Sequence, residues 1–128
     1  MMDRPSPAQP YDGRHLLADL HNCGAQLDDV KLIESALREA AQAAGATVLD
    51  VRLHHFGGRQ GVTGVALLAE SHISIHSWPE HRYAALDFFL CGKRHDIDAA
   101  LAVMVAALAP GDVRTSLVER GYASGVLA

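Results

Sequence analysis

The stretch LLAESHISIHSWPE, residues 67–80, concentrates side chains that can carry out nucleophilic and acid–base chemistry. A serine in a strained turn, such as Ser71, can attack the carbonyl carbon of Glu70 and turn the amide into an ester. If a base then removes the Ser71 α-proton, the ester leaves by elimination, and the dehydroalanine left behind hydrolyses to a pyruvoyl group. The chain is then cut, and its new N-terminus carries a ketone. The alternative interpretation is that Ser71 is an ordinary turn residue, since serine is common in turns.

Two histidines follow this pair at strand spacing. His72, Ser74 and His76 share one parity, so they can line one face of a half-buried strand. Histidine is the natural proton carrier near neutral pH, although either ring can equally be a satisfied core or surface residue. Together with His54 and His55 they make four imidazoles, but the spacing fits no standard zinc pattern and no cysteine pair supports one. We therefore expect no metal.

Four further residues can contact a substrate. Cys91 ends a strand-like run, where a thiol that faces a pocket can donate a proton, although a buried and inert cysteine is commoner. Trp78 and Phe56 lie at strand ends, where each can stack on a planar ligand or pack in the core. Glu80 can accept hydrogen bonds from two sugar hydroxyls, or can be a plain exposed carboxylate. The loop GGRQGVTG lacks the Lys-Ser/Thr ending and the helix of a phosphate-binding loop.

The elements that must position these residues follow from periodicity and capping. Apolar alternation predicts six strands, at residues 14–20, 47–56, 62–69, 72–77, 83–90 and 113–118. Two amphipathic helices are predicted, one at 28–44 and one from Asp96 or Asp98 to 109. This order predicts an α+β fold, a two-layer α/β sandwich whose largely antiparallel sheet carries both helices on one face. The other sheet face stays uncovered, so we expect a homodimer.

Composition bounds the class of protein. The chain has 128 residues with a formal net charge of −4 and 49% hydrophobic residues, which indicates one globular domain at 13–120. Nucleic acid and membrane partners are not expected, because the chain has no basic run and no apolar stretch long enough for a span. With no secretory signal, the expected location is the cytoplasm. Residues 1–12 predict a disordered lead and 121–128 a loose tail.

The run GVTGVALLAESHISIHSWPEHRYAALDFFLCG, residues 61–92, resembles the prokaryotic S-adenosylmethionine decarboxylase proenzymes, the short pyruvoyl-dependent family. The likeness extends back through GRHLLADLHNC at 13–23 and AAGATVLDVRLHHF at 43–56, and forward to about residue 118. The AESHISIH core, followed by WPE and then CG at these spacings, is the specific part of the signature.

The resemblance implies that the chain cuts itself between Glu70 and Ser71. The products would be a β chain, 1–70, and an α chain, 71–128, whose first residue becomes the pyruvoyl cofactor. Thr63 stands where the family often has a serine that assists this processing, and threonine keeps the hydroxyl. His76 matches the histidine that transfers protons during processing.

The family's substrate contacts map onto four positions. Cys91 matches the cysteine that returns a proton to the substrate carbon, and Glu80 matches the carboxylate that holds the ribose hydroxyls. Trp78 falls in the same ligand-lining stretch. Phe56 resembles the aromatic residue that stacks on adenine, although the loop after it, GGRQG, is one residue longer than usual.

The implied activity is decarboxylation of S-adenosylmethionine. The substrate amine forms a Schiff base with the ketone at position 71, carbon dioxide leaves, and the product is the aminopropyl donor for spermidine in polyamine biosynthesis. The resemblance also implies an (αβ)₂ dimer. Two alternatives stay open: a pyruvoyl-dependent arginine or ornithine decarboxylase of the same family, and a non-processed binding relative without catalysis. Trp78 and Glu80 favour the nucleoside substrate.

Overall fold

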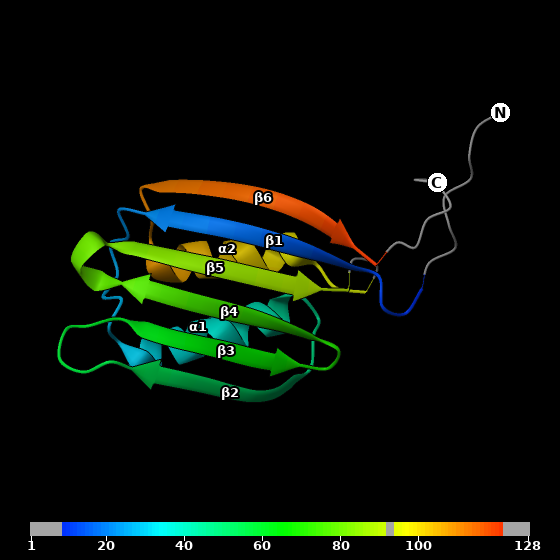
Figure 1. The fold of residues 1–128 in the computed structure, drawn as a ribbon, viewed down its shortest axis with the longest axis horizontal. Coiled ribbons are helices and arrows are strands. Elements are labelled where there is room, and N and C mark those ends of the chain that lie inside the picture. Colours follow the sequence, from blue (N-terminus) through cyan, green and yellow to red (C-terminus); the bar gives the residue numbers. More distant parts are fainter. Residues whose placement is uncertain (1–8, 92–93, 122–128) are drawn as a thin grey trace.

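The computed structural model describes residues 9–91 and 94–121 (Figure 1). The elements in chain order are β1 (Gly13–His21), α1 (Val30–Ala43), β2 (Val48–His55), β3 (Val62–Leu68), β4 (Ser71–Trp78), the 3₁₀ turn η1 (Pro79–His81), β5 (Tyr83–Leu90), α2 (Ile97–Leu108) and β6 (Asp112–Arg120). The predicted order is confirmed, and no boundary is shifted by more than two residues. Most of the predicted lead and tail, residues 1–8 and 122–128, lies outside the described residues.

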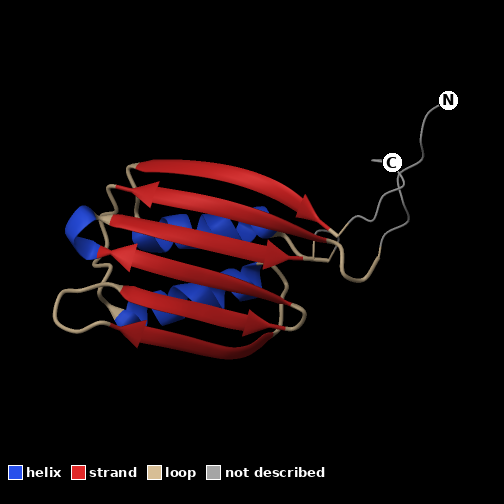
Figure 2. Cartoon of the chain, viewed as in Figure 1, coloured by secondary structure: helices blue, strands red, loops and turns tan. Residues whose placement is uncertain are grey.

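The six strands form one sheet in the order β2-β3-β4-β5-β1-β6, and every neighbouring pair is antiparallel. Both helices lie on the same side of this sheet (Figure 2). Helix α1 packs over β2 and β3, and α2 packs over β1. The predicted two-layer α+β fold is therefore confirmed. Neither helix is long and apolar enough to cross a membrane, within the ranges that the structure describes.

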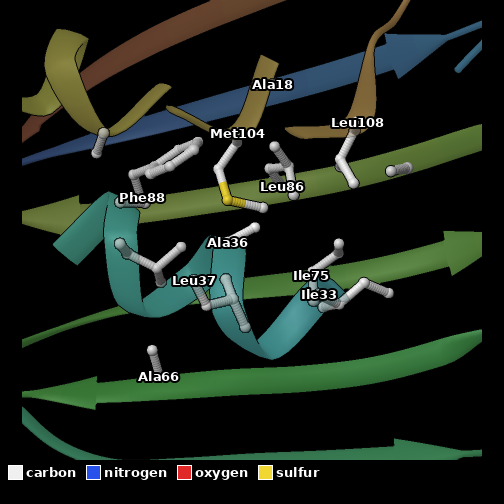
Figure 3. Packing of buried hydrophobic residues seen from close by; sticks show 14 of the residues in the cluster. Ala18, Ile33, Ala36, Leu37, Ala66, Ile75, Leu86, Phe88, Met104 and Leu108 are labelled. Carbon is white, nitrogen blue, oxygen red and sulfur yellow. The ribbon is translucent and has the colours of Figure 1, made fainter. Parts of the chain in front are cut away.

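The core lies between the helices and the sheet (Figure 3). Helix α1 begins after Asp29, whose carboxylate accepts a hydrogen bond from the Leu32 amide at 3.1 Å, and this cap satisfies one of the unpaired amides of the first turn. The helices contribute apolar residues spaced three or four apart, and the strands contribute every second residue. The fully buried side chains include Ile33, Leu37, Ile73, Ile75, Leu86, Phe88, Met104 and Leu108.

The opposite alternation of the same strands forms the second sheet face. His72, Ser74, His76 and Trp78 of β4 have the parity opposite to the buried isoleucines, so they lie on the face away from the helices. No described element packs over this face. The predicted shared face of the β4 histidines is therefore the uncovered one.

One part of the predicted alternation is wrong. Strict alternation along the predicted strand at 47–56 puts Leu49 on the same side as Val51, but a β-bulge shifts the register between Val48 and Asp50. Val48 consequently packs against the core together with Val51, and Leu49 is 67% exposed. An inserted residue of this kind changes which face each following side chain occupies, and apolar periodicity does not reveal it.

Leu37 and Leu49 make a matched pair for testing this packing. Leu37 is 0% exposed and Leu49 is 67% exposed. Leu37→Ala is expected to lower the free energy of unfolding by about 2–5 kcal/mol, because it leaves a cavity in the core. Leu49→Ala is expected to change it by less than about 0.5 kcal/mol. Denaturant unfolding of both variants checks this, and equal losses would contradict the assigned faces.

Candidate active site

Glu70 occupies the second position of a two-residue turn between β3 and β4. Leu68 pairs with Ser71 across the hairpin, which leaves Ala69 and Glu70 as the turn. The Glu70 φ angle is 65°, in the left-handed region that favours glycine. A residue with a side chain is held there at a cost of roughly 1–2 kcal/mol. The peptide bond predicted to be cut therefore follows a strained residue.

Ser71 is the first residue of β4, and its side chain is partly enclosed. It has the alternation of Ile73 and Ile75, which pack toward the helices. The Ser71 Oγ atom is buried, and no described residue forms a hydrogen bond with it. Most buried hydroxyls have a partner, so this one is not serving as an ordinary turn cap.

Cys91 lies beside this turn, at the end of β5. His72 pairs with Phe89, so one more step along each strand brings Ser71 opposite Leu90 and next to Cys91. A cavity of about 380 Å³ lies here and is lined by Glu70, Phe89, Cys91 and Arg94, together with Pro10, Tyr11, Asp12, Gly13 and Leu90. We refer to Glu70, Ser71, Cys91 and Arg94 as the cleavage end.

The remaining predicted residues lie together at the other end of the strands. A hollow of about 440 Å³ is lined by Phe56, Thr63, His76, Trp78 and Glu80, with Gln60, Gly61 and Ser77. The Thr63 Oγ1 atom lies 3.0 Å from His76 Nδ1, so these two side chains form a hydrogen-bonded pair. We refer to Phe56, Thr63, His76, Trp78 and Glu80 as the aromatic end.

Trp78 is held by a row of stacked rings. The His76 and Trp78 ring centroids are 5.6 Å apart, and those of Trp78 and Tyr83 are 5.3 Å apart. His21 continues the row, with its ring 4.8 Å from that of Tyr83. The Tyr83 hydroxyl donates to Asp19 Oδ1 at 2.5 Å. This row fixes the plane of the indole beside the hollow, where Trp78 remains 40% exposed.

The two ends are far apart in one chain. Ser71 and His76 lie five residues apart on the same strand, and a strand rises about 3.3 Å per residue, which separates their Cα atoms by about 17 Å. The structure thus brings five predicted residues together at the aromatic end and three at the cleavage end. A single chain does not place His76 next to Ser71.

Two contributors were not predicted from the sequence. Arg94, for which no motif indicates a role, donates from Nη2 to Glu70 Oε2 at 2.7 Å and from Nε to Cys91 Sγ at 3.4 Å. Tyr83 was predicted only as a strand residue, yet it supports Trp78. The pairing of Trp78 with Tyr83 across β4 and β5 was open to prediction from a hairpin register, whereas nothing in the sequence pointed to Arg94.

No set of three or more histidine, cysteine or acidic side chains able to hold a metal ion occurs in the described part of the chain.

Comparison with known proteins assigns the family. A sequence profile described as S-adenosylmethionine decarboxylase matches residues 14–121. The S-adenosylmethionine decarboxylase proenzyme of Methanococcus aeolicus is 44% identical over 110 residues, covering 85% of this chain and 93% of that protein. The proenzyme of Thermomicrobium roseum is 38% identical over 109 residues, with coverage of 85% and 93%.

The fold agrees with a solved member of the same group. The crystal structure of the adenosylmethionine decarboxylase from Aquifex aeolicus superposes with a TM-score of 0.79 at 36% identity, covering 88% of this chain and 93% of that one. The architecture is thus that of a solved adenosylmethionine decarboxylase, and the sequence is similar to those of proenzymes of the same activity. The chain belongs to the S-adenosylmethionine decarboxylase family.

The Tyr83 hydroxyl offers a direct test of the ring row. Its hydrogen bond to Asp19 and its partial burial raise the pKa of Tyr83 to about 12. The raised value means that the protonated phenol stabilises the fold at lower pH and that this contribution is lost as pH rises from about 10 through about 12. Ultraviolet titration is expected to show one tyrosine ionising near 12 that disappears in Tyr83→Phe. Asp19→Asn is expected to lower that pKa, and an unchanged value would refute the contact.

Proposed function

We propose that this chain is an S-adenosylmethionine decarboxylase that makes its own pyruvoyl cofactor from Ser71. The observation that carries the proposal is the geometry at the turn, where Glu70 has a left-handed φ and the buried Ser71 Oγ has no described hydrogen-bond partner. Family membership supports the same assignment. The expected location of such a biosynthetic enzyme is the cytoplasm.

The proposed self-cleavage proceeds in three balanced steps. Ser71 Oγ bonds to the Glu70 carbonyl carbon, the C–N bond breaks, and the hydroxyl proton passes to the freed nitrogen. Removal of the Ser71 α-proton then breaks the Cβ–O bond and releases Glu70 as a free carboxylate. Water finally replaces the nitrogen, which leaves as ammonia, and position 71 retains a ketone. His76, paired with Thr63 at 3.0 Å, is the proposed proton carrier.

In decarboxylation, the pyruvoyl ketone supplies an electron sink for the electrons of the departing carboxylate. The residues of the chain bind the substrate and return a proton to it. Cys91, which lines the same cavity as Glu70, is the proposed donor of a proton to the substrate carbon. The aromatic faces of Trp78 and Phe56 suit both an adenine ring and a sulfonium cation. Glu80, in the same hollow, can accept hydrogen bonds from both ribose hydroxyls.

We further propose that the working unit is a homodimer whose sites draw on both chains. Ser71 and His76 are about 17 Å apart within one chain, too far for proton transfer. The uncovered sheet face carries half-exposed apolar residues, among them Leu17, Leu67, Trp78 and Val118. Two copies that pack antiparallel through this face would bring the cleavage end of one chain against the aromatic end of its partner. Two complete sites would result.

Mixed dimers test this arrangement. His76→Ala and Ser71→Ala chains, each with a different tag, are each expected to stay uncut when expressed alone. When they are co-expressed, the His76→Ala chain is expected to split after Glu70, because the partner supplies its intact imidazole. Purification through both tags and a denaturing gel give the readout. An uncut His76→Ala chain in purified mixed dimers would disprove the two-chain site.

Substrate choice separates the proposal from its alternatives. Release of labelled carbon dioxide is expected from carboxyl-labelled S-adenosylmethionine and not from arginine or ornithine. Glu80→Gln is expected to raise KM about tenfold to a hundredfold, since a charged acceptor for the ribose hydroxyls is worth about 1.5–3 kcal/mol. Ser71→Ala is the inactive control. Release from arginine or ornithine alone would assign the other activity, and release from none of the three would indicate a binding relative.

The chain has a single tryptophan, so its fluorescence gives an independent measurement of ligand binding near Trp78. S-adenosylmethionine is expected to quench Trp78 fluorescence in the uncut Ser71→Ala protein, because binding there needs only the aromatic end. Phe56→Ala in the same background is expected to weaken that binding by about 1–3 kcal/mol, the usual value of base stacking on an aromatic ring. Fluorescence that does not respond to the nucleoside would place the ligand elsewhere.

A further inference from the structure

Arg94 is followed by two residues whose backbone amides are hydrogen-bonded. The His95 amide donates to the Cys91 carbonyl at 3.0 Å, and the Asp96 amide donates to the Ala44 carbonyl at 3.0 Å. Asp96 also caps α2, where its Oδ1 accepts from the Ala99 amide at 3.0 Å. The backbone that follows Arg94 is therefore tied to α1, to α2 and to the end of β5.

The Arg94 guanidinium reaches two groups of the cleavage end at once. Its Nη2 lies 2.7 Å from Glu70 Oε2, and its Nε lies 3.4 Å from Cys91 Sγ. Both contacts favour the charged guanidinium and raise the pKa of Arg94, with the larger effect from Cys91. Arg94 thus links the residue that precedes the scissile bond to the proposed proton donor.

The pair adds little to the stability of the fold. The Arg94 and Glu70 side chains are 57% and 66% exposed, and exposed ion pairs contribute little to the free energy of unfolding because water and salt screen them. A contact that fixes geometry can still change a reaction rate, because a displacement of about 1 Å at a reacting centre can cost about a hundredfold. The relevant geometry here is the left-handed Glu70, which has a disfavoured φ of 65° and needs outside contacts to persist.

We propose that Arg94 is a positioning residue for self-cleavage, which holds the Glu70 side chain and so keeps the Glu70 carbonyl in reach of Ser71 Oγ. This inference rests on the proposed self-processing at Glu70-Ser71 and adds a residue to it. The bidentate fork of arginine suits the task, because it contacts Glu70 through one nitrogen and Cys91 through another, which a lysine ammonium cannot do with fixed geometry.

The charge on Glu70 increases during cleavage, and this change gives Arg94 a second way to accelerate the reaction. Glu70 begins with one carboxylate, on its side chain. When elimination breaks the Cβ–O bond of the ester, the electron pair stays on the ester oxygen and Glu70 acquires a second carboxylate. A guanidinium already bound to the side chain lowers the free energy of this doubly charged end by charge attraction. Loss of Arg94 should therefore slow both ester formation and elimination.

The test follows cleavage directly, without substrate. Chains are made by cell-free synthesis, synthesis is stopped, and the uncut fraction is followed by denaturing gel. Arg94→Gln is expected to cleave about tenfold more slowly than the unmodified chain, equivalent to about 1.4 kcal/mol in the barrier. Arg94→Lys is expected to be intermediate, since the charge remains and the fork is lost. Hydroxylamine, which cuts the ester, reports the ester that has formed at each time.

Two controls distinguish the loss of the Arg94 contact from the loss of any positive charge and from a change in fold stability. Arg38→Gln removes another exposed ion pair, that of Arg38 with Glu34 at 3.0 Å on α1, and is expected to leave cleavage unchanged. Thermal unfolding of the uncut Ser71→Ala background is expected to give the same midpoint with and without Arg94→Gln. Glu70→Gln is expected to reproduce the defect of Arg94→Gln, and the double variant should be no slower than either single one.

Two outcomes would overturn the inference. The first is cleavage of Arg94→Gln at the rate of the unmodified chain, and the second is full additivity of the Arg94→Gln and Glu70→Gln defects. An unmodified chain that never cuts would refute the proposed self-processing itself. The two failures are therefore distinguishable in the same experiment.

Discussion

The alternation of side chains along β4 puts the candidate polar residues on one face of the sheet and the core residues on the other. Ile73 and Ile75 lie under the helices, whereas His72, Ser74 and His76 lie on the opposite face. Because successive strand residues point to opposite faces, a slip of one residue would bury the histidines and expose the isoleucines. The pairing of β4 with both β3 and β5 in fixed register prevents such a slip. The cleavage end and the aromatic end both depend on this register.

The rigidity of the same strand also separates the two ends. A paired central strand neither bends nor shortens enough to bring residues five positions apart into contact, so Ser71 and His76 cannot act on each other within one chain. A second copy packed on the uncovered face can bring its own His76 to Ser71 of the first copy, which a single chain cannot do. In the proposed mechanism, association and catalysis therefore use the same surface.

Much of this arrangement was predictable from local sequence. The order of elements, an aspartate cap at the start of each helix and the Glu70-Ser71 bend follow from periodicity and turn chemistry, which act over a few residues. The bulge in β2 was not predictable, because an inserted residue leaves the apolar composition of the strand unchanged. Arg94 was not predictable either, because its contact with Glu70 joins residues 24 positions apart in the chain. The separation of the candidate residues into two ends became visible only when strand lengths and register were known.

The central claim is that this chain cuts itself at one bond and converts Ser71 to a ketone. Intact-mass measurement of the purified protein under denaturing conditions, with and without phenylhydrazine as a carbonyl trap, tests it most directly. Self-cleavage at Glu70-Ser71 predicts two chains, 1–70 and 71–128, with one hydrazone on the second chain alone. A single uncut chain of 128 residues, or a second chain that begins with an unmodified serine, would contradict it.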